Sequence, residues 1–387
     1  SPSPTLIIMP PSGYLRHHLG LKGSPMKITS VESFKLEIPI TEDQKRLRYY
    51  NKTGVTRIRT DEGITGYGWA EVDPEAANAL LIGKDPIQIE RHVAEGLGHA
   101  FFGAENALWD IVGKSFGQPL HKLWGSYRDH MQLYLTTVWP VDAHQTEVSP
   151  EQQADDLAHY ASLGYEAFKI RIWRPDFMDD VKTAQLVRSQ IGGPEKAELM
   201  FDRTGDGPGI DWDFDTGVRV AEALHEAGAQ WLEEPFVRGD IERHARLRAV
   251  STIPITGGEH QPLDVYDDYF QGQSFDIIQP HCANVLMHLK KIAGAAELFG
   301  VDCIFHGQHG MNLIGSLQVG ATIPSCRMQE IVFNTPPTPP TEAWSPLNNL
   351  VKSDELLTVS DGRVTIPAEP GLGIDVDDAA VDRYRLS

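Results

Sequence analysis

The chain of 387 residues is acidic, with a formal net charge of −20, and it is 41% hydrophobic and 23% charged. This length and composition are typical of a globular protein with one large domain and a smaller unit. The acidic balance argues against nucleic acid as a partner, because nucleic-acid binding requires basic patches, and no apolar run reaches the ~18 residues that would cross a membrane. An acidic protein that binds an anionic substrate needs a local cation, such as a metal ion.

The amino-terminal segment and the cysteines bear on the compartment of the protein. Residues 1–25 are rich in proline, glycine and serine and lack the apolar core of a signal peptide. We interpret them as an extension or a remnant of an expression vector, with the first domain beginning near Met26. The three cysteines form no Cys-x-x-Cys motif and are odd in number, which argues against a disulfide framework and predicts a cytoplasmic location.

Residues 26–130 predict a small α+β unit. Strand-like alternation runs over 27–40 and 54–72, and the turn residues Asp61-Glu62-Gly63 predict a hairpin within the second segment. A basic, aromatic loop at 41–53 separates the two segments, and residues 103–117 have a helical pattern.

Residues 131–349 repeat one pattern eight times. Short apolar runs alternate with amphipathic helix patterns, and the runs span 133–139, 167–173, 198–203, 230–235, 253–259, 275–280, 301–306 and 328–333. Eight such units predict a (β/α)8-type barrel. A doubly wound sheet is the weaker alternative, because no glycine-rich phosphate loop follows the first strand.

Polar residues stand at the ends of these predicted strands, where a barrel of this type carries its active site. They are Lys169, Arg171, Asp202, Glu233, Glu259, His281, His306 and Glu330. One polar strand end is ordinary, but three successive strands here each deliver a carboxylate.

The three carboxylates predict a metal site. Asp202, Glu233 and Glu259 should converge at the barrel mouth, where unpaired carboxylates require a cation. Oxygen ligands favour Mg²⁺, with Mn²⁺ as the alternative. Side chains alternate along a strand, so Glu233 and Glu234 should face opposite ways, although alternation alone does not say which faces the metal.

Taken together, these motifs resemble the mandelate racemase branch of the enolase superfamily. The resemblance covers residues 27–387 and includes Lys169-Ile170-Arg171, "FD", "WLEEP", "GGEH", "QPH" and the carboxy-terminal "PGLGIDV". It implies that residues 26–130, completed by 350–387, form a capping domain on a barrel at 131–349. It also implies that Glu233 is the metal ligand of the Glu-Glu-Pro motif, and that Asp202 and Glu259 complete the set.

Two positions depart from the family pattern. Arg171 replaces the second lysine of a Lys-x-Lys pair, and His281 stands where an aspartate usually orients the catalytic histidine. Arg171 is unsuited to act as a base because guanidinium stays protonated. We expect His306 to be the base, with Lys169 as the rival, its pKa lowered by Arg171 and the metal. His281 is expected to orient His306 or to act as an acid, and Glu330 to polarise the substrate carboxylate if it is protonated.

The expected reaction is Mg²⁺-dependent dehydration of a sugar acid to a 2-keto-3-deoxy acid. The alternatives are a racemase, epimerase or cycloisomerase, and a barrel that binds a ligand without catalysis. We expect a homo-oligomer whose partner is a small sugar-acid substrate. The expected substrate contacts are Arg46, Tyr49 and Tyr50 in the 41–53 loop, Trp139 and Trp173 at strand ends, and His309.

Overall fold

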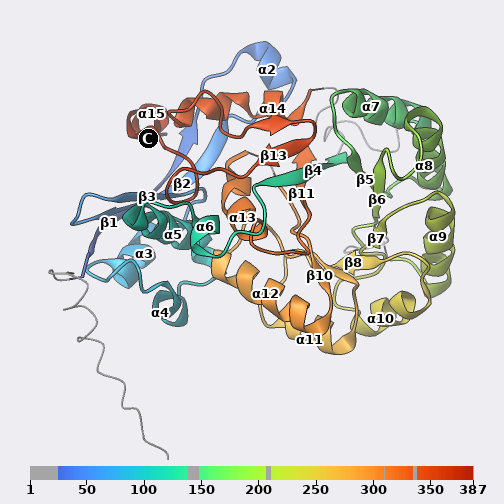
Figure 1. Ribbon diagram of the computed structural model, residues 1–387, viewed down its shortest axis with the longest axis horizontal. Helices are drawn as coiled ribbons and strands as arrows, with labels where there is room; N and C mark the ends of the chain where they lie inside the picture. Colours follow the sequence, from blue (N-terminus) through green and yellow to red (C-terminus); the bar gives the residue numbers. More distant parts are fainter. Residues whose placement is uncertain (1–24, 138–147, 206–210, 309, 334–337, 387) are drawn as a thin grey trace, which may run out of the picture.

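The computed structural model describes residues 25–137, 148–205, 211–308, 310–333 and 338–386. Figure 1 shows a ring of strands enclosed by helices, with a small sheet unit beside it. Within the described residues, no helix is both long and apolar enough to cross a membrane.

The small unit contains a three-stranded antiparallel sheet in the order β1 (Ile28–Glu37), β2 (Lys52–Thr60) and β3 (Thr65–Gly68). The predicted hairpin at residues 61–63 is confirmed, because β2 pairs with β3 across it. The helices of this part are α3 (Pro74–Leu81), α4 (Ile89–Ala94), η1 (His99–Phe101), α5 (Phe102–Phe116) and α6 (Leu120–Leu123). Helix α5 packs directly on β3, where a Cβ at Gly68 would collide with the backbone of Gly103.

The segment expected to be a loop at 41–53 contains a short helix, α2 (Glu42–Arg46), and the first residues of β2. Thr41 and Gln44 form a reciprocal capping box, in which each side chain accepts a hydrogen bond from the backbone of the other residue. This capping explains how so short a helix forms in a polar stretch.

In the part of the chain that the structure describes, eight parallel strands form the barrel, which confirms the predicted fold class (Figure 1). In order around the ring they are β4 (His130–Thr137), β5 (Ala167–Arg171), β6 (Glu198–Asp202), β7 (Trp231–Glu233), β8 (Ile255–Gly257), β9 (Ile277–Ile278), β10 (Asp302–Cys303) and β11 (Met328–Phe333). Strand β11 pairs with β4, and a parallel bridge between Gln308 and Ile331 joins the segment after β10 to β11.

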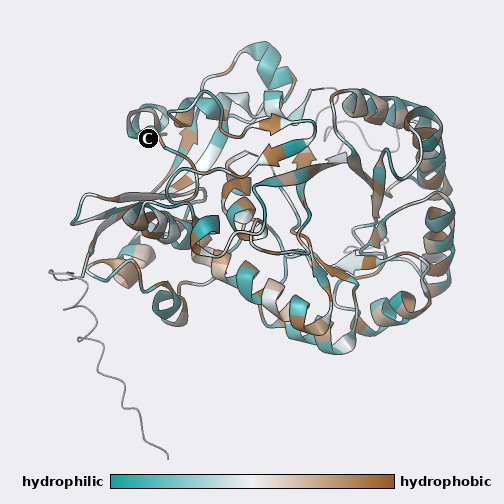
Figure 2. Cartoon of the chain, in the orientation of Figure 1, coloured by the Kyte–Doolittle hydropathy of each residue, from teal (hydrophilic) through white to brown (hydrophobic). Residues whose placement is uncertain are grey.

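Helices cover the outside of the ring. They are α7 (Pro150–Ser162), α8 (Met178–Ile191), α9 (Phe214–Glu226), α10 (Ile241–Val250), α11 (Val265–Gly272), α12 (Leu286–Phe299), η3 (Gly310–Asn312) and α13 (Leu313–Gly320). Local sequence sets their ends: Ser149 caps α7 ahead of Pro150, and Gly300 ends α12 in the left-handed conformation. Figure 2 shows hydrophobic and hydrophilic residues interspersed along these helices, as amphipathic helices require.

The carboxy-terminal segment contacts both parts of the molecule. It contains α14 (Pro340–Ala343), η4 (Ser345–Leu350), β12 (Val359–Ser360), β13 (Arg363–Thr365) and α15 (Asp378–Tyr384). Strand β13 pairs antiparallel with barrel strand β4, while Arg385 forms an ion pair of 3.0 Å with Glu32 on β1. The assignment of residues 350–387 to the capping domain stays a prediction.

The interior of the barrel is arranged in two layers. The lower layer is a buried apolar cluster of Tyr134, Ala167, Met200, Trp231, Ile277, Ile304 and Met328. Two residues further along each segment lies a buried polar side chain, and these are Thr136, Lys169, Asp202, Glu233, Gln279, His306 and Glu330. Because residues two apart on a strand face the same side, the apolar layer forms a floor beneath a polar layer at the mouth.

Candidate active site

Lys169 lies at the centre of the polar layer and is fully buried. Its Nζ is 2.9 Å from both carboxylate oxygens of Glu233, 2.9 Å from Glu330 Oε1 and 3.5 Å from Asp202 Oδ2. Burial acts against the charged amine, but these carboxylates outweigh it and raise the pKa of Lys169 above its ordinary value. The expected lowering of this pKa is therefore opposed by the protein's own charges, and Lys169 is suited to hold a positive charge.

The two adjacent glutamates of the Glu-Glu-Pro motif have separate partners. Glu233 lies two residues after Trp231 of the barrel floor and turns inward to Lys169. Glu234 is also buried but accepts hydrogen bonds of 2.8–2.9 Å from Arg238 Nε. Burial raises the pKa of Glu233 to about 7 and that of Glu234 to about 8. The structure thus directs Glu233 into the polar layer and Glu234 away from it.

Glu330 is a buried connector between Lys169 and His306. Its Oε1 faces Lys169, while its Oε2 lies 3.1 Å from His306 Nδ1 and accepts a hydrogen bond of 2.8 Å from the backbone of Gly307. Burial would raise the pKa of Glu330, but Lys169 and His306 hold it well below its ordinary value. The two cations thus favour the ionised form of Glu330, whereas the expected role as a donor to the substrate calls for the protonated form.

His306 is held at one ring nitrogen. Its Nδ1 lies 2.7 Å from Glu259 Oε2 and 3.1 Å from Glu330 Oε2. Burial acts against the charged ring, but Glu330 and Glu259 raise the pKa of His306 to about 10. Within the described residues, Nε2 of His306 has no hydrogen-bond partner, so this nitrogen is available for proton transfer.

The ring nitrogens of His281, which is expected to orient His306 or to act as an acid, contact other groups in the structure. Its Nε2 lies 2.9 Å from Gln308 Nε2, and its Nδ1 lies 3.1 Å from the backbone nitrogen of Ala283. The two histidine rings are neighbours, with centroids 5.0 Å apart. Burial lowers the pKa of His281 to about 3, so it is neutral and a poor acid. The carboxylates that contact Nδ1 of His306 are instead Glu259 and Glu330.

Arg171 faces the edge of the carboxylate cluster. Its Nη1 is 3.4 Å from Asp202 Oδ2 and bonds to the hydroxyl of Thr204, and its guanidinium lies 5.6 Å from the ring centre of Trp173. Burial opposes its charge, but Asp202 and the neighbouring carboxylates raise the pKa of Arg171. Arg171 is suited to hold an anionic group and unsuited to exchange a proton.

Backbone conformation is unusual where the first three carboxylate-bearing segments end. Thr204, Glu234 and His260 have φ values of 49°, 43° and 54°. Each follows one of the predicted metal ligands by one or two residues. Non-glycine residues in this region cost of order 1–3 kcal/mol each and cluster at functional sites.

The donor set at the mouth suits a divalent cation. Ligand atoms of Glu233, Glu259 and His306 all lie within 4.8 Å of one another. Glu259 Oε2 is buried with no hydrogen bond. Asp202 is the cross-strand neighbour of Glu233, so the three predicted carboxylates meet at one edge. Buried carboxylates in this number match the oxygen ligands that Mg²⁺ prefers.

The residues of the 41–53 segment that are expected to contact the substrate are less tightly grouped than the polar layer. Arg46 is exposed and pairs with Asp43 of its own helix at 3.3 Å, so the structure does not bring it to the polar layer. Tyr49 donates its hydroxyl to Glu342, and the backbone of Tyr50 bonds to Ala343 at 2.7 Å. Both tyrosines thus lie against α14, which follows barrel strand β11.

Of the other residues expected to contact the substrate, the structure describes Trp173. Trp173 is 43% exposed beside Arg171, which leaves its ring available to a ligand. Trp139 and His309 lie outside the described residues.

Arg238 and Gln308 are polar contacts at the site that the strand-end pattern missed. Arg238 bonds both Glu234 and Glu259, and Gln308 contacts His281 while accepting a hydrogen bond of 2.8 Å from Asn312. Arg238 lies between β7 and α10, outside any helix or strand, so no periodic pattern marked it. Gln308 also belongs to an irregular segment, for which the sequence carried no such pattern.

Comparison with known proteins identifies the family. The sequence profile described as "Enolase C-terminal domain-like" matches residues 152–380. The chain therefore belongs to the enolase superfamily, and the resemblance to its mandelate racemase branch is confirmed.

Individual relatives catalyse different reactions. The chain is 30% identical over 392 aligned residues to D-galactarolactone cycloisomerase of Agrobacterium fabrum, covering 93% of this chain and 99% of the relative. It is 24% identical to arabinonate dehydratase of Saccharolobus solfataricus, covering 85% and 90%. A magnesium complex of D-glucarate dehydratase from Agrobacterium tumefaciens has the same fold, with a TM-score of 0.77, 24% identity and coverage of 94% and 100%. These similarities support a sugar-acid function and leave the reaction open.

Proposed function

We propose that this protein is a Mg²⁺-dependent dehydratase of an aldonic or aldaric acid, producing a 2-keto-3-deoxy acid. The observation that supports the proposal is the difference in contacts between the two basic groups on Glu330. The amine of Lys169 is enclosed by Glu233, Glu330 and Asp202, whereas His306, whose pKa is also raised, meets its carboxylates at Nδ1 and keeps Nε2 for proton exchange.

Asp202, Glu233 and Glu259 are the proposed ligands of the ion. A divalent cation there would stabilise negative charge developing on the substrate carboxylate, and would offset the carboxylate charge that keeps His306 protonated. Glu234 is excluded from this set in the proposal because both of its carboxylate oxygens accept hydrogen bonds from Arg238 Nε, on the side away from the polar layer.

In the proposed reaction, His306 Nε2 removes the proton from the carbon next to the substrate carboxylate. The carbon–oxygen bond to the β-hydroxyl then breaks, and His306, which now carries the α-proton, gives a proton to that oxygen so that it leaves as water. Lys169 and Arg171 hold the substrate anion, and the enol product tautomerises to the 2-keto acid. A positioned acid–base group contributes typically about 10²–10⁴-fold to such a step.

Racemisation demands more than this arrangement supplies. It requires a second group that gives and takes protons on the opposite face of the planar intermediate. Arg171 returns protons very slowly because its pKa lies above ~12. Elimination needs one histidine that can accept the α-proton, and the same histidine can assist the leaving hydroxyl.

A cycloisomerase is the second candidate, favoured by the 30% identity to D-galactarolactone cycloisomerase. That reaction would also begin with proton removal beside a carbonyl group but would lose no water. The proposal further includes a homo-oligomer in the cytoplasm. The cytoplasmic location is supported by the buried free thiols of Cys282, Cys303 and Cys326, which suit a reducing compartment.

The test is a screen of aldonic acids, aldaric acids and their lactones with the Mg²⁺-loaded protein. We expect 2-keto acid formation with loss of one water by mass, absent when Mg²⁺ is chelated and in a His306→Asn control. Inversion at the α-carbon without keto acid would instead establish a racemase or epimerase. Consumption of a lactone with unchanged mass would establish the cycloisomerase.

A further inference from the structure

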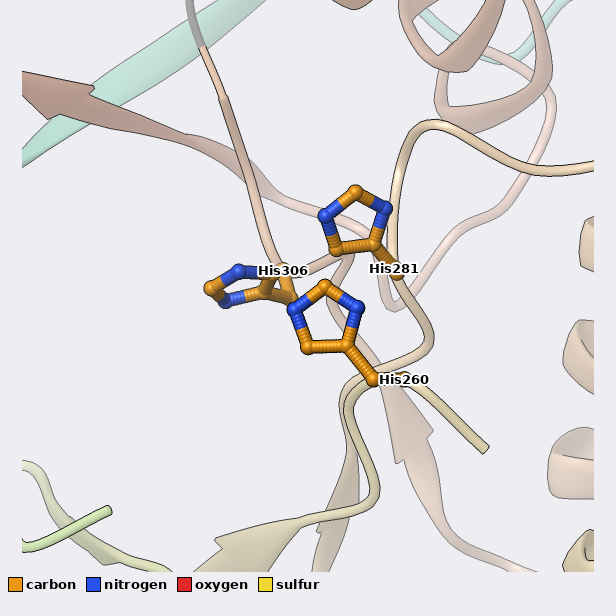
Figure 3. A group of neighbouring side chains, drawn as sticks. All are labelled: His260, His281 and His306. Carbon is orange, nitrogen blue, oxygen red and sulfur yellow. The ribbon is translucent and has the colours of Figure 1, made fainter. Parts of the chain in front are cut away.

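Three histidines gather on the side of the mouth away from Lys169. His260, His281 and His306 come from the segments that follow β8, β9 and β10, and Figure 3 shows their rings grouped together. The ring centroids are 4.1 Å apart for His260 and His281, 5.0 Å for His281 and His306, and 5.4 Å for His260 and His306. One ring nitrogen from each lies within 4.8 Å of the others.

The contacts of His306 resemble those of a histidine prepared for metal binding. Its Nδ1 faces the carboxylates of Glu259 and Glu330 at 2.7 and 3.1 Å, which leaves Nε2 as the ligand atom. Metal-binding histidines commonly present their second nitrogen to a carboxylate in this way, which fixes the ring and strengthens the ligand.

A cavity beside the cluster offers an approach for an ion. It has a volume of about 350 Å³, and its lining includes His99, His260, His281, Asn284 and His288. His260 is itself exposed, so one ligand of the three is directly accessible.

We propose that His260, His281 and His306 form a nitrogen-donor site for a late first-row divalent cation such as Zn²⁺ or Co²⁺, separate from the oxygen-donor site of Asp202, Glu233 and Glu259. Neutral imidazole suits these ions, whereas Mg²⁺ prefers carboxylates and water. The two sites share a boundary at the contact between His306 and Glu259.

Ion binding requires a small inward movement of the rings. Nitrogens that bind one tetrahedral ion at about 2.0–2.1 Å lie roughly 3.3–3.4 Å from one another. Gln308 Nε2, which lies 2.9 Å from His281 Nε2, must also turn aside to release that nitrogen. Gln308 therefore competes with the ion for His281.

Occupation of this site has a consequence for catalysis, and this part rests on the proposed function. An ion on Nε2 of His306 removes the nitrogen that exchanges the α-proton. Zn²⁺ is therefore expected to inhibit Mg²⁺-dependent turnover without displacing Mg²⁺.

The experiment is a Co²⁺ titration of the Mg²⁺-saturated protein, followed by the visible absorption of nitrogen-coordinated Co²⁺. His260→Asn is the main variant, because asparagine tolerates the left-handed backbone at φ 54°. His288→Asn is the matched control, since His288 lines the same cavity but is outside the cluster. We expect affinity to fall about tenfold or more in His260→Asn, a loss at least as large as for changes around metal ligands, and to be unchanged in His288→Asn.

Two further measurements complete the test. Gln308→Leu should bind Co²⁺ more tightly, because the competing amide is gone, and His260→Asn should turn over normally with Mg²⁺ while losing inhibition by Zn²⁺. An absorption titration that is the same in wild type and His260→Asn overturns the site. Because the titration needs no substrate, this result is distinguishable from a failure of the dehydratase proposal.

Discussion

The two halves of the barrel mouth differ in their polar groups: one contains buried ion pairs and the other contains histidines. The carboxylate half consists of Lys169, Asp202, Glu233 and Glu330 on β5, β6, β7 and β11, all buried and joined by ion pairs of 2.9–3.5 Å. The histidine half consists of His260, His281 and His306 in segments after β8, β9 and β10. Burial lowers the pKa of His260 and His281, while neighbouring carboxylates raise that of His306.

This difference indicates that the two halves are suited to different chemical tasks. In the carboxylate half, each charge is held in place by an opposite charge, so the groups form a fixed electrostatic frame for an anionic substrate and its cation. In the histidine half, the imidazoles provide nitrogen lone pairs, and His306 is the group proposed to exchange a proton. His306 belongs to both, because Glu259 and Glu330 connect it to the frame.

The largest expected effect comes from removing the central cation of the frame. Lys169→Met leaves the carboxylates of Glu233, Glu330 and Asp202 without their shared partner. Breaking a buried ion pair from one side typically costs about 3–5 kcal/mol, so we expect a loss of this size in the free energy of unfolding. Urea denaturation in the presence of a chelator measures it.

Lys182→Met is the control for this change. Lys182 pairs with Glu151 at 2.6 Å on the surface, with side chains 49% and 55% exposed. Such pairs contribute about 0–1 kcal/mol. Equal losses for the two lysine variants would contradict the view of Lys169 as the centre of a buried frame.

The next effect tests proton exchange in the histidine half. His306→Asn should lower turnover and α-proton exchange by about 10²–10⁴-fold while the protein stays folded, because it removes the exchanging nitrogen. Exchange is followed by NMR in D₂O, with circular dichroism to check the fold. Exchange at the wild-type rate would transfer the role of base to another group.

A third effect concerns the cation of the carboxylate half. Mg²⁺ at 100 times its dissociation constant should raise the free energy of unfolding by about 2.7 kcal/mol if it binds only the folded protein. Glu259→Gln should lose most of this gain, because it removes one proposed ligand. Thermal or urea unfolding with and without Mg²⁺ provides the measurement, and full stabilisation of the variant would remove Glu259 from the ligand set.

Periodicity explains why the frame could be predicted from the sequence. Lys169, Asp202 and Glu233 each stand two residues after an apolar residue of the barrel floor, so period-two alternation and the order of the strands suffice to bring them together. The strand-end pattern marked His306 and Glu330 in the same way.

Other features depended on contacts that no local pattern encodes. The role expected for His281 assumed that it replaces an orienting aspartate, whereas its ring contacts Gln308 from an irregular segment. The lowered pKa of Glu330 follows from Lys169 on β5 and from His306 in the segment after β10. The helix at Glu42–Arg46 was missed because its single turn is specified by a capping box rather than by apolar periodicity.

The smallest effect separates His281 from His306 within the histidine half. His281→Asn should reduce turnover by less than about tenfold, corresponding to under about 1.4 kcal/mol in the activation free energy. The physical reason is that His306 contacts Glu259 and Glu330 through Nδ1, whereas His281 contacts Gln308 and the backbone near Ala283. The rings of His281 and His306 are close, with centroids 5.0 Å apart. Because burial lowers the pKa of His281 to about 3, however, its ring carries no extra proton that it could transfer. Steady-state kinetics with the identified substrate gives the comparison, and the pH profile of kcat should keep its wild-type shape. A loss as large as that of His306→Asn, or a profile missing one ionisation, would show that His281 supplies the acid after all and that proton exchange extends across the whole histidine half.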